Sequence, residues 1–271
     1  MMQDQIANVL WNRLIGPAHY RIGLACGPEM ADAVPGQFVM VQLLPCSPVL
    51  LRRPFSICKP IEENGAVIGI ELIYKVVGQG TRAMAALKPG AKLKLLGPLG
   101  NGFKFPIQAK NHLLVAGGVG VAPLVFLAWS MAQNGVSGKC CQVYIGGRTE
   151  EELFCRDDFA GLGYRCRVGT DDGSAGDQCL ITDPVADAVT ETCPDMIYAC
   201  GPLPMITCLL GIAEKAQSPC QVALETVMAC GMGVCLGCAV KPKKASKSYL
   251  HACTDGPVFD AAVVDLAALT S

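Results

Sequence analysis

The sequence predicts a multidomain protein of the β plus α/β class, with an antiparallel β-barrel or sandwich, a doubly wound parallel sheet and a small cysteine-rich lobe. Three observations predict this fold: short apolar runs separated by turns, then apolar strands alternating with helical segments, then four closely spaced cysteines. The chain has 271 residues, of which 51% are hydrophobic, enough for more than one core. We expect domains at 1–106, 107–220 and 221–271.

The first region has the pattern of an antiparallel sheet. Its apolar runs are broken by the tripeptides VPG at 34–36, ENG at 63–65 and KPG at 88–90. Proline, glycine and asparagine favour tight turns, so these breaks mark the ends of successive short strands.

The second region alternates between strand and helix patterns. The apolar segments at 112–118, 141–148 and 195–201 each precede a helical pattern, as in HLLVAGG followed by APLVFLAWSMAQNG. This alternation is typical of a parallel, doubly wound sheet. The uncharged stretch at 113–138 is long enough to imitate a membrane span, but GGVGVAP within it would break a lipid-exposed helix. We therefore expect no membrane span, and instead a buried strand, a glycine turn and a helix.

Charge and cysteine usage limit the possible functions. The formal net charge of −1 provides no excess of positive charge for binding nucleic acid, so we expect no nucleic-acid partner. The chain shows no charged-then-apolar signal segment at its start, and twelve of its sixteen cysteines are scattered without a disulfide framework. These features indicate buried thiols in a reducing cytoplasm.

The remaining four cysteines have the spacing of an iron–sulfur site. They follow the order C-x4-C-x2-C, with fourteen residues before the last, and they are Cys230, Cys235, Cys238 and Cys253. This is the plant-type order of 2Fe-2S ligands, which predicts single-electron transfer. A structural zinc site is the alternative, although zinc sites more often pair two short knuckles.

Glycines separate these cysteines. Gly231, Gly233 and Gly237 fall between ligands, where the backbone must bend closely around a cluster and direct amides at its sulfurs.

Two segments of the first region suggest a phosphate-bearing ligand. In LLRRPFSI, Arg52 and Arg53 form an arginine fork suited to a diphosphate, although an ordinary strand entry has the same appearance. In IYKVVGQGTRAM, Gly78, Gly80 and Thr81 offer backbone amides and a hydroxyl at the start of a helical run, which is typical of a phosphate site.

The second region has a candidate dinucleotide site. GGVGVAP, at 117–123, follows a strand at the point where such sheets contact phosphate or ribose. The strict G-x-G-x-x-G fingerprint is absent, and a close strand-to-helix packing turn would use the same glycines. Cys200, Gly201 and Pro202 end another strand at the same edge, where an ordinary buried cysteine is the alternative for Cys200.

Several of these motifs occur in a familiar order. RPFS, GQGT, GGVGVAP and YACGP, followed by the cysteine run, resemble the ferredoxin-NADP reductase superfamily with an added cluster. More narrowly, LETVMACGMGVCLGCAV and YLHACTDGPVFDAAVV are similar to the family of electron-transfer subunits of type B dihydroorotate dehydrogenase. The resemblance covers essentially the whole chain. It implies an FAD-binding β-barrel, an NAD-binding α/β domain and a 2Fe-2S domain.

The resemblance also assigns site residues. It places FAD against Arg53, Pro54, Phe55, Ser56, Ile73, Tyr74, Lys75, Gly80 and Thr81. Phe55 stands where tyrosine is usual in the superfamily, so a hydroxyl contact is missing while ring packing can persist.

A second set of residues is implied for NAD. It comprises Gly117, Gly118, Gly120, Ala122, Pro123, Gly201 and Pro202, with Cys200 as the candidate catalytic residue. Asp171 or Asp172 is a candidate for the adenosine ribose, where a carboxylate would favour NADH over NADPH, and a plain acidic turn is the alternative.

The implied cofactors form one sequence of electron transfer. Nicotinamide exchanges a hydride and a 2Fe-2S centre takes one electron, so a flavin must stand between them. The resemblance implies a partner, an FMN-containing dihydroorotate dehydrogenase catalytic subunit, in a heterotetramer of two copies of each chain, serving pyrimidine synthesis.

Two alternatives stay open at this point. One is the small subunit of a sulfide dehydrogenase or of an NADH-dependent ferredoxin:NADP oxidoreductase, which commonly has aspartate where this chain has Cys230. The other is a non-enzymatic iron–sulfur regulatory or binding module on the same fold.

Overall fold

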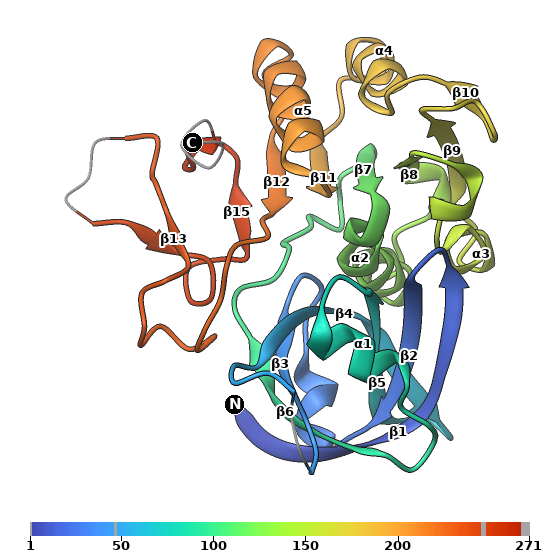
Figure 1. Cartoon of the computed structure of the whole chain (residues 1–271). Coiled ribbons are helices and arrows are strands. Elements are labelled where there is room, and N and C mark those ends of the chain that lie inside the picture. Colours follow the sequence, from blue (N-terminus) through green and yellow to red (C-terminus); the bar gives the residue numbers. More distant parts are fainter. Residues whose placement is uncertain (1, 46–47, 245–247, 267–271) are drawn as a thin grey trace.

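A closed antiparallel barrel forms the first part of the chain (Figure 1). The structure, a computed structural model, describes residues 2–45, 48–244 and 248–266. In these residues the barrel strands are β1 (Gln3–Gly16), β2 (His19–Ala25), β3 (Phe38–Leu43), β4 (Arg53–Glu63), β5 (Ala66–Lys75) and β6 (Lys92–Leu99), in the order β1-β2-β5-β4-β3-β6. A short 3-10 helix, η1 (Pro28–Asp32), and helix α1 (Gln79–Ala85) lie in its connections. The sequence pattern is compatible with either a barrel or a sandwich, and the structure shows a closed barrel.

Alternate residues of the barrel strands fill its interior. Ile22 and Leu24 on β2 lie opposite Leu72 and Ile70 on β5, and all four side chains are fully buried. Because successive side chains of a strand point to opposite faces, this register gives the barrel one apolar inner face.

A parallel sheet forms the second part. Among the residues described, its order is β10-β9-β8-β7-β11-β12-β15, in which only β15 is antiparallel to its neighbour. The parallel strands are β7 (His112–Gly117), β8 (Cys141–Gly147), β9 (Arg165–Thr170), β10 (Asp177–Gln178), β11 (Met196–Cys200) and β12 (Cys220–Ala223). The order reverses between β7 and β11, which creates the topological switch point where open α/β sheets bind ligands.

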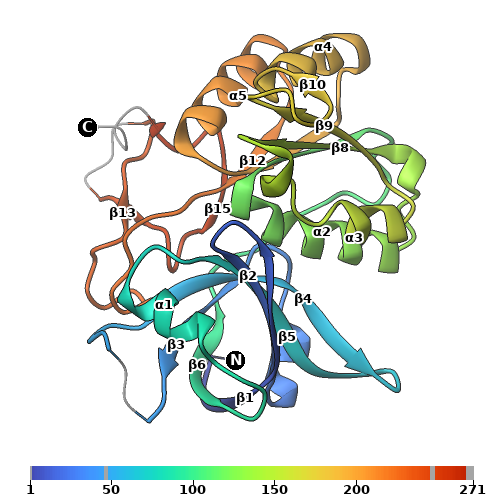
Figure 2. The same ribbon diagram turned by 45° about the vertical axis from the view of Figure 1, so that its right-hand side comes forward.

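Helices cover both faces of this sheet. They are α2 (Val121–Gln133), α3 (Arg156–Gly161), α4 (Thr182–Thr192) and α5 (Leu203–Lys215), with 3-10 turns η2 (Gly118–Gly120), η3 (Gly138–Cys140) and η4 (Glu150–Glu152). Figure 2 shows α4 and α5 on one side of the strands and α2 and α3 on the other. Leu113 and Val115 of β7 pack in the core with α4 and α5, whereas Leu114 and Ala116 pack in the core with α2 and α3. A strand covered on both faces is apolar along most of its length, as β7 is after His112.

The uncharged stretch at 113–138 therefore forms a strand, a glycine turn and a helix, as predicted. No helix in the described ranges combines the length and apolarity needed to cross a membrane.

The C-terminal lobe is joined to both other parts. It contains β13 (Ala239–Val240), β14 (Leu250–His251) and β15 (Val258–Asp260). β15 extends the parallel sheet by pairing with β12, and the Asn101 side chain after the barrel donates to the carbonyl oxygens of Thr254 and Asp255, each at 3.0 Å. These contacts fix the lobe against the barrel and the sheet. The domain limits at 106 and 220 stay a prediction.

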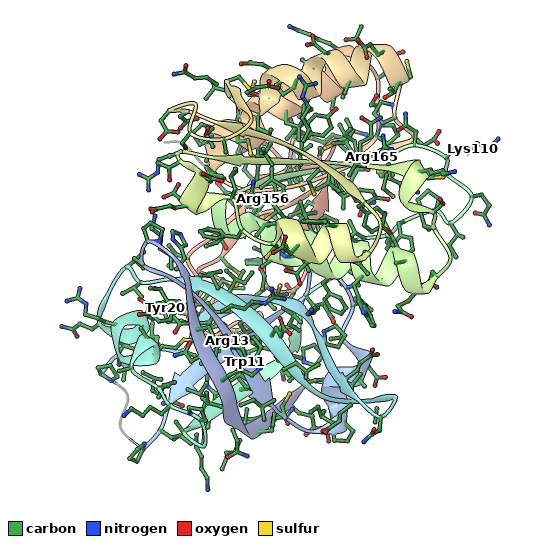
Figure 3. The ribbon with its side chains drawn as sticks, turned by 90° about the vertical axis from the view of Figure 1, so that its right-hand side faces the viewer. Trp11, Arg13, Tyr20, Lys110, Arg156 and Arg165 are labelled. Atoms are coloured by element: carbon green, nitrogen blue, oxygen red, sulfur yellow. The ribbon has the colours of Figure 1, made fainter. Side chains whose placement is uncertain are left out.

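A buried ion cluster fastens the barrel to the sheet domain. Arg21 of β2 donates through Nη1 and Nη2 to the two carboxylate oxygens of Asp158 on α3, at 2.7 and 2.8 Å, and through Nε to Glu71 at 2.6 Å. Lys59 Nζ lies 3.3 Å from Asp158 Oδ1. The Arg21, Glu71 and Asp158 side chains are only 11–17% exposed. Figure 3 shows the barrel strands that carry Tyr20, Trp11 and Arg13 below α3, the helix that begins at Arg156.

The charge state of Asp158 follows from this cluster. Burial opposes its ionisation, but the Arg21 hydrogen bond and the positive charges of Arg21 and Lys59 outweigh burial and lower the carboxyl pKa. Asp158 is therefore a carboxylate that holds two domains together.

We predict that Asp158→Asn lowers the free energy of unfolding by about 2 kcal/mol, because Arg21 loses its paired charge-assisted hydrogen bonds across the domains and keeps only Glu71 as a carboxylate partner. A lowered native pKa stabilises the fold above the ordinary aspartate pKa, and this contribution is lost as the pH falls through the lowered value. The difference between the variant and the natural chain should therefore shrink in acid. Urea unfolding at several pH values measures both effects.

Asp177→Asn is the matched control. Asp177 pairs with Arg167 at 3.0 Å, but both side chains are about half exposed, so its loss should cost less than about 1 kcal/mol. Equal losses for the two variants would contradict a special role of Asp158.

Candidate functional site

A crevice of about 610 Å³ lies at the switch point of the parallel sheet. The residues after β7, β8, β9 and β11 meet there because the carboxyl ends of parallel strands share one edge. The predicted nucleotide residues in its wall are Gly117, Gly118, Gly120, Asp171, Gly201 and Pro202. Ala122 lines the neighbouring pocket, and Pro123 is buried within α2.

The glycines of the turn after β7 have different roles. A Cβ on Gly120 would lie 2.4 Å from the carbonyl oxygen of Cys200, and one on Gly117 would lie 2.7 Å from Pro202 Cδ, so both allow close packing of β7 against β11. Gly118 has φ +53°, and a Cβ there would have no atom within 4 Å, so Gly118 opens the backbone to the crevice. Gly117 and Gly120 thus serve the close packing of the strands, whereas Gly118 is the residue suited to a ligand.

Cys200 is buried, and it is not among the described residues that line either pocket. Burial raises the pKa of its thiol far above the ordinary value, so it stays neutral. Its catalytic role stays a prediction.

The two adjacent aspartates that follow β9 are distinguished by their contacts. Asp172 accepts from the Ser174 amide at 2.9 Å and from its hydroxyl at 2.6 Å, which lowers the Asp172 pKa. Asp172 therefore holds a turn. Asp171 lines the crevice, and its carboxylate has no hydrogen-bond partner among the residues described.

A second pocket of about 450 Å³ lies between the barrel and the sheet domain. Every residue implied for FAD is in its wall: Arg53, Pro54, Phe55, Ser56, Ile73, Tyr74, Lys75, Gly80 and Thr81. The opposite wall comes from the turn before α2 and from the segment that follows β12, and includes Val119, Ala122, Leu224, Glu225, Thr226 and Met228.

The two arginines before Pro54 also differ in their contacts. Arg52 is held by Asp4 through Nη1–Oδ1 and Nη2–Oδ2 contacts of 3.0 and 2.8 Å. Arg53 lines the pocket, and within the described residues it donates only to the carbonyl oxygens of Leu51 and Arg52. Arg53 thus has a positive charge available for a phosphate.

Other polar groups of this pocket support its walls. The Thr81 hydroxyl accepts from the amides of Val77 and Gly78 at 2.9 and 3.1 Å, which fixes the glycine turn before α1. Tyr74 donates to Asn12 Oδ1 at 3.0 Å, and its ring meets the edge of Phe55 with centroids 6.0 Å apart. Phe55 therefore packs on Tyr74 in the wall of this pocket, and its packing on a flavin ring stays a prediction.

The two pockets share a wall. Among the described residues, Lys75, Val119 and Glu225 line both. Glu225 is open to solvent, but the surrounding walls partly desolvate its carboxyl and raise its pKa. The sequence analysis missed Glu225, although its place directly after β12, at the carboxyl edge of the sheet, could have indicated it.

The four predicted metal ligands gather in the C-terminal lobe as two pairs. Cys238 Sγ lies 3.2 Å from Cys253 Sγ, and Cys230 interacts with Cys235. In the described part of the chain, no three histidine, cysteine or acidic side chains are arranged around a single metal ion. Two pairs of thiolates suit a cluster of two irons, each of which takes two protein ligands.

Backbone amides point at these sulfurs. Cys230 Sγ accepts from the amides of Met232 and Cys235 at 3.5 and 3.4 Å, and Cys253 Sγ accepts from Gly233 at 3.1 Å. Although burial acts in the opposite direction, the main-chain bonds lower the pKa of Cys230 to about 6. The loop thus favours a thiolate, the form that binds iron.

The loop geometry requires glycine at two of the three positions identified. Gly231 has φ +74° and a Cβ there would lie 2.5 Å from Met40 Cγ, while Gly233 has φ +81° and a Cβ would lie 2.8 Å from Thr254 Cγ2. Gly237 has neither constraint, since its nearest neighbour would be Cys235 Sγ at 3.7 Å.

Two family models match the chain. Residues 225–265 match the iron–sulfur cluster binding domain of dihydroorotate dehydrogenase B, and residues 114–210 match the oxidoreductase NAD-binding domain.

The chain is also similar to curated proteins. It is 38% identical over 254 residues to the dihydroorotate dehydrogenase B (NAD(+)) electron transfer subunit of Caldanaerobacter subterraneus, covering 93% of this chain and 95% of that protein. The subunit of the same name from Bacillus caldolyticus is 38% identical over 271 residues, with 98% and 100% covered.

Solved structures have the same fold. The structure of an NADH-dependent reduced ferredoxin-NADP oxidoreductase superposes with a TM-score of 0.84 at 29% identity, covering 98% of this chain and 92% of that one. A ferredoxin NADP+ reductase from Neisseria gonorrhoeae gives a TM-score of 0.65 at 16% identity, covering 79% of this chain and 91% of that one, which shows the fold alone.

We predict that Gly233→Ala lowers iron retention in the C-terminal lobe. The left-handed backbone costs alanine roughly 1–2 kcal/mol, and the added methyl displaces the amide that faces Cys253. Gly237→Ala is the matched control and should retain iron as the natural chain does. Iron and sulfide assays of the purified variants measure the difference, and equal iron content in both variants would contradict the proposed geometry.

Proposed function

Because the chain belongs to the family of dihydroorotate dehydrogenase B electron-transfer subunits, we propose that its three sites carry electrons between NAD and a partner subunit. The chain is an NAD-linked flavin and iron–sulfur oxidoreductase subunit that uses FAD, a 2Fe-2S cluster and NAD in pyrimidine biosynthesis. The observation that carries the proposal is the shared wall of the two pockets at Glu225, from which the chain reaches Cys230 in five residues.

Each site is assigned by the residues that form it. FAD is held in the 450 Å³ pocket, with Arg53 near its phosphates and Phe55 against its ring. NAD lies in the switch-point crevice, with the open backbone at Gly118 near its phosphates and Asp171 at its adenosine ribose.

The residues in the shared wall of the two pockets would orient the flavin and nicotinamide rings toward each other. Bound flavin supplies the exchange of a two-electron hydride for single electrons. Val119 lines both pockets together with Lys75 and Glu225, so the rings of the two cofactors could meet at this shared wall. The buried, neutral thiol of Cys200 would add no charge to this site, while Lys75, in the shared wall, would place a positive charge beside the bound cofactors.

The ferredoxin-oxidoreductase alternative is less well supported. That structure is 29% identical to the chain, whereas the dihydroorotate dehydrogenase B subunits are 38% identical over nearly the same length. The iron–sulfur model that matches residues 225–265 also belongs to dihydroorotate dehydrogenase B.

The cluster loop carries an exposed apolar surface. Met232, Val234 and Leu236 alternate along the loop and are 41–76% exposed, and the ligand Cys235 between them is also exposed. Exposed apolar side chains around a redox ligand suit a permanent protein contact, because burying them removes apolar area from water. We place the FMN-containing catalytic subunit on this loop.

Assembly and compartment follow as proposals. Two copies of each chain form the complex, and it works in the cytoplasm, where NAD is available. Burial raises the pKa of thiols such as Cys141 and Cys220 to about 12, so they behave as small apolar residues suited to a reducing compartment.

The proposed function predicts divided activity. The isolated chain should reduce an artificial acceptor with NADH, since its own sites suffice for that reaction, and it should not oxidise dihydroorotate. Adding the purified catalytic subunit should couple dihydroorotate oxidation to NAD reduction, measured as NADH absorbance. Dihydroorotate turnover by this chain alone would contradict the proposal.

We also predict that Val234→Glu weakens binding of the catalytic subunit by about tenfold or more, because a charge would be buried in an apolar contact. NADH-dependent reduction of an artificial acceptor should not change. Leu14→Glu is the control, since Leu14 is exposed and lies near the end of β1. Figure 1 shows this end of β1 on the opposite side of the molecule from the C-terminal lobe. Calorimetric titration with iron-matched samples measures affinity, and equal binding by both variants would place the interface elsewhere.

A further inference from the structure

Thr226 has a buried hydroxyl without a partner. Its Oγ1 is inaccessible to solvent and makes no hydrogen bond with any described residue. The residue itself lies in the wall of the barrel-side pocket, next to Glu225, which lines both pockets. A buried hydroxyl without a hydrogen-bond partner costs free energy unless a bound ligand supplies that partner.

The position of Thr226 distinguishes it from similar atoms. Within the described residues, the other buried side-chain atoms without a partner are Gln5 Nε2 and His112 Nε2, and neither residue lines the two pockets. The hydroxyls of Thr81 and Tyr74 in the same pocket already have protein partners. Among the described residues of this pocket, Thr226 is thus the one whose hydroxyl is both buried and without a partner.

We propose that the Thr226 hydroxyl forms a hydrogen bond with the polar edge of the bound flavin ring and fixes the ring between the nicotinamide site and the cluster. This inference rests on the proposed function. Rotation about χ1 exchanges the hydroxyl and methyl groups of threonine, so the hydroxyl reaches the pocket without backbone movement. The ring, rather than the phosphates, is the partner because Thr226 directly follows Glu225, which lines both pockets, whereas Arg53 and the glycine turn lie at the barrel wall.

The segment that carries Thr226 strengthens this inference. Leu224, Glu225, Thr226 and Met228 all line the pocket, and the first cluster ligand, Cys230, follows two residues later. A hydrogen bond from this segment ties the ring to the backbone that holds the cluster. The separation of the two centres is then set by a short, fixed stretch of chain.

Thr226→Val separates this role from a structural one, because it keeps the side-chain shape and removes the hydroxyl. In the flavin-free full-length chain, the variant should melt at the same temperature as the natural chain or higher, since an unsatisfied buried hydroxyl is lost. FAD binding should weaken by roughly tenfold, the value of one hydrogen bond, and the visible spectrum of the bound flavin should shift.

Two further variants complete the test. Thr226→Ser retains the hydroxyl and should restore the affinity and the spectrum. Thr190→Val removes a hydroxyl on α4 that bonds to Ala186 O, away from the pocket, and should leave both unchanged. Fluorescence titration with FAD, absorbance spectra and thermal melts provide the three readouts.

The outcomes are distinct. If the natural chain binds FAD and Thr226→Val has the same affinity and spectrum, the Thr226 contact is refuted while the proposed function stands. A lower melting temperature with unchanged FAD affinity would also refute it, since the hydroxyl would then serve the fold. If the natural chain does not bind FAD, both the contact and the proposed flavin site are overturned.

Discussion

The carboxyl edge of the parallel sheet is the constraint on which the rest of the structure depends. The strand order reverses between β7 and β11, so the connections after these strands diverge and leave a crevice at that edge. β12, next in the sheet, ends at the same edge, and its continuation at Glu225 faces both the crevice and the barrel pocket. One sheet therefore determines how the crevice, the barrel pocket and the start of the cysteine lobe lie relative to one another.

This arrangement works only if the barrel and the lobe are held firmly against the sheet. The Arg21–Asp158 contact fixes the barrel through a charged pair that is largely removed from water. The lobe is fixed differently, by strand pairing of β15 with β12 and by the close approach of Gly231 to Met40 of the barrel. Because electron transfer depends steeply on separation, these contacts serve the function as much as the stability.

The sequence was sufficient for the architecture, and residues that it proposed for each site lie together in the fold, but it could not decide choices that depend on distant partners. Periodicity and turn residues predicted the barrel and the parallel sheet, and cysteine spacing predicted the cluster lobe. Asp4, far from the arginine pair in the sequence, decides that Arg52 is held and Arg53 is available. Gly118 could not be distinguished from Gly117 and Gly120, because the difference lies in the atoms that each faces. The three-residue strand β15 is too short to show a pattern of its own.

The central claim is that NADH, flavin and the cluster form one electron path within this chain. An anaerobic titration of the purified chain with NADH, followed by visible absorbance and electron paramagnetic resonance, tests it most directly. The account predicts that the flavin absorbance bleaches and that the signal of a reduced 2Fe-2S cluster appears in the same sample. A flavin that bleaches without any cluster signal, or a colourless sample that contains zinc, would contradict it.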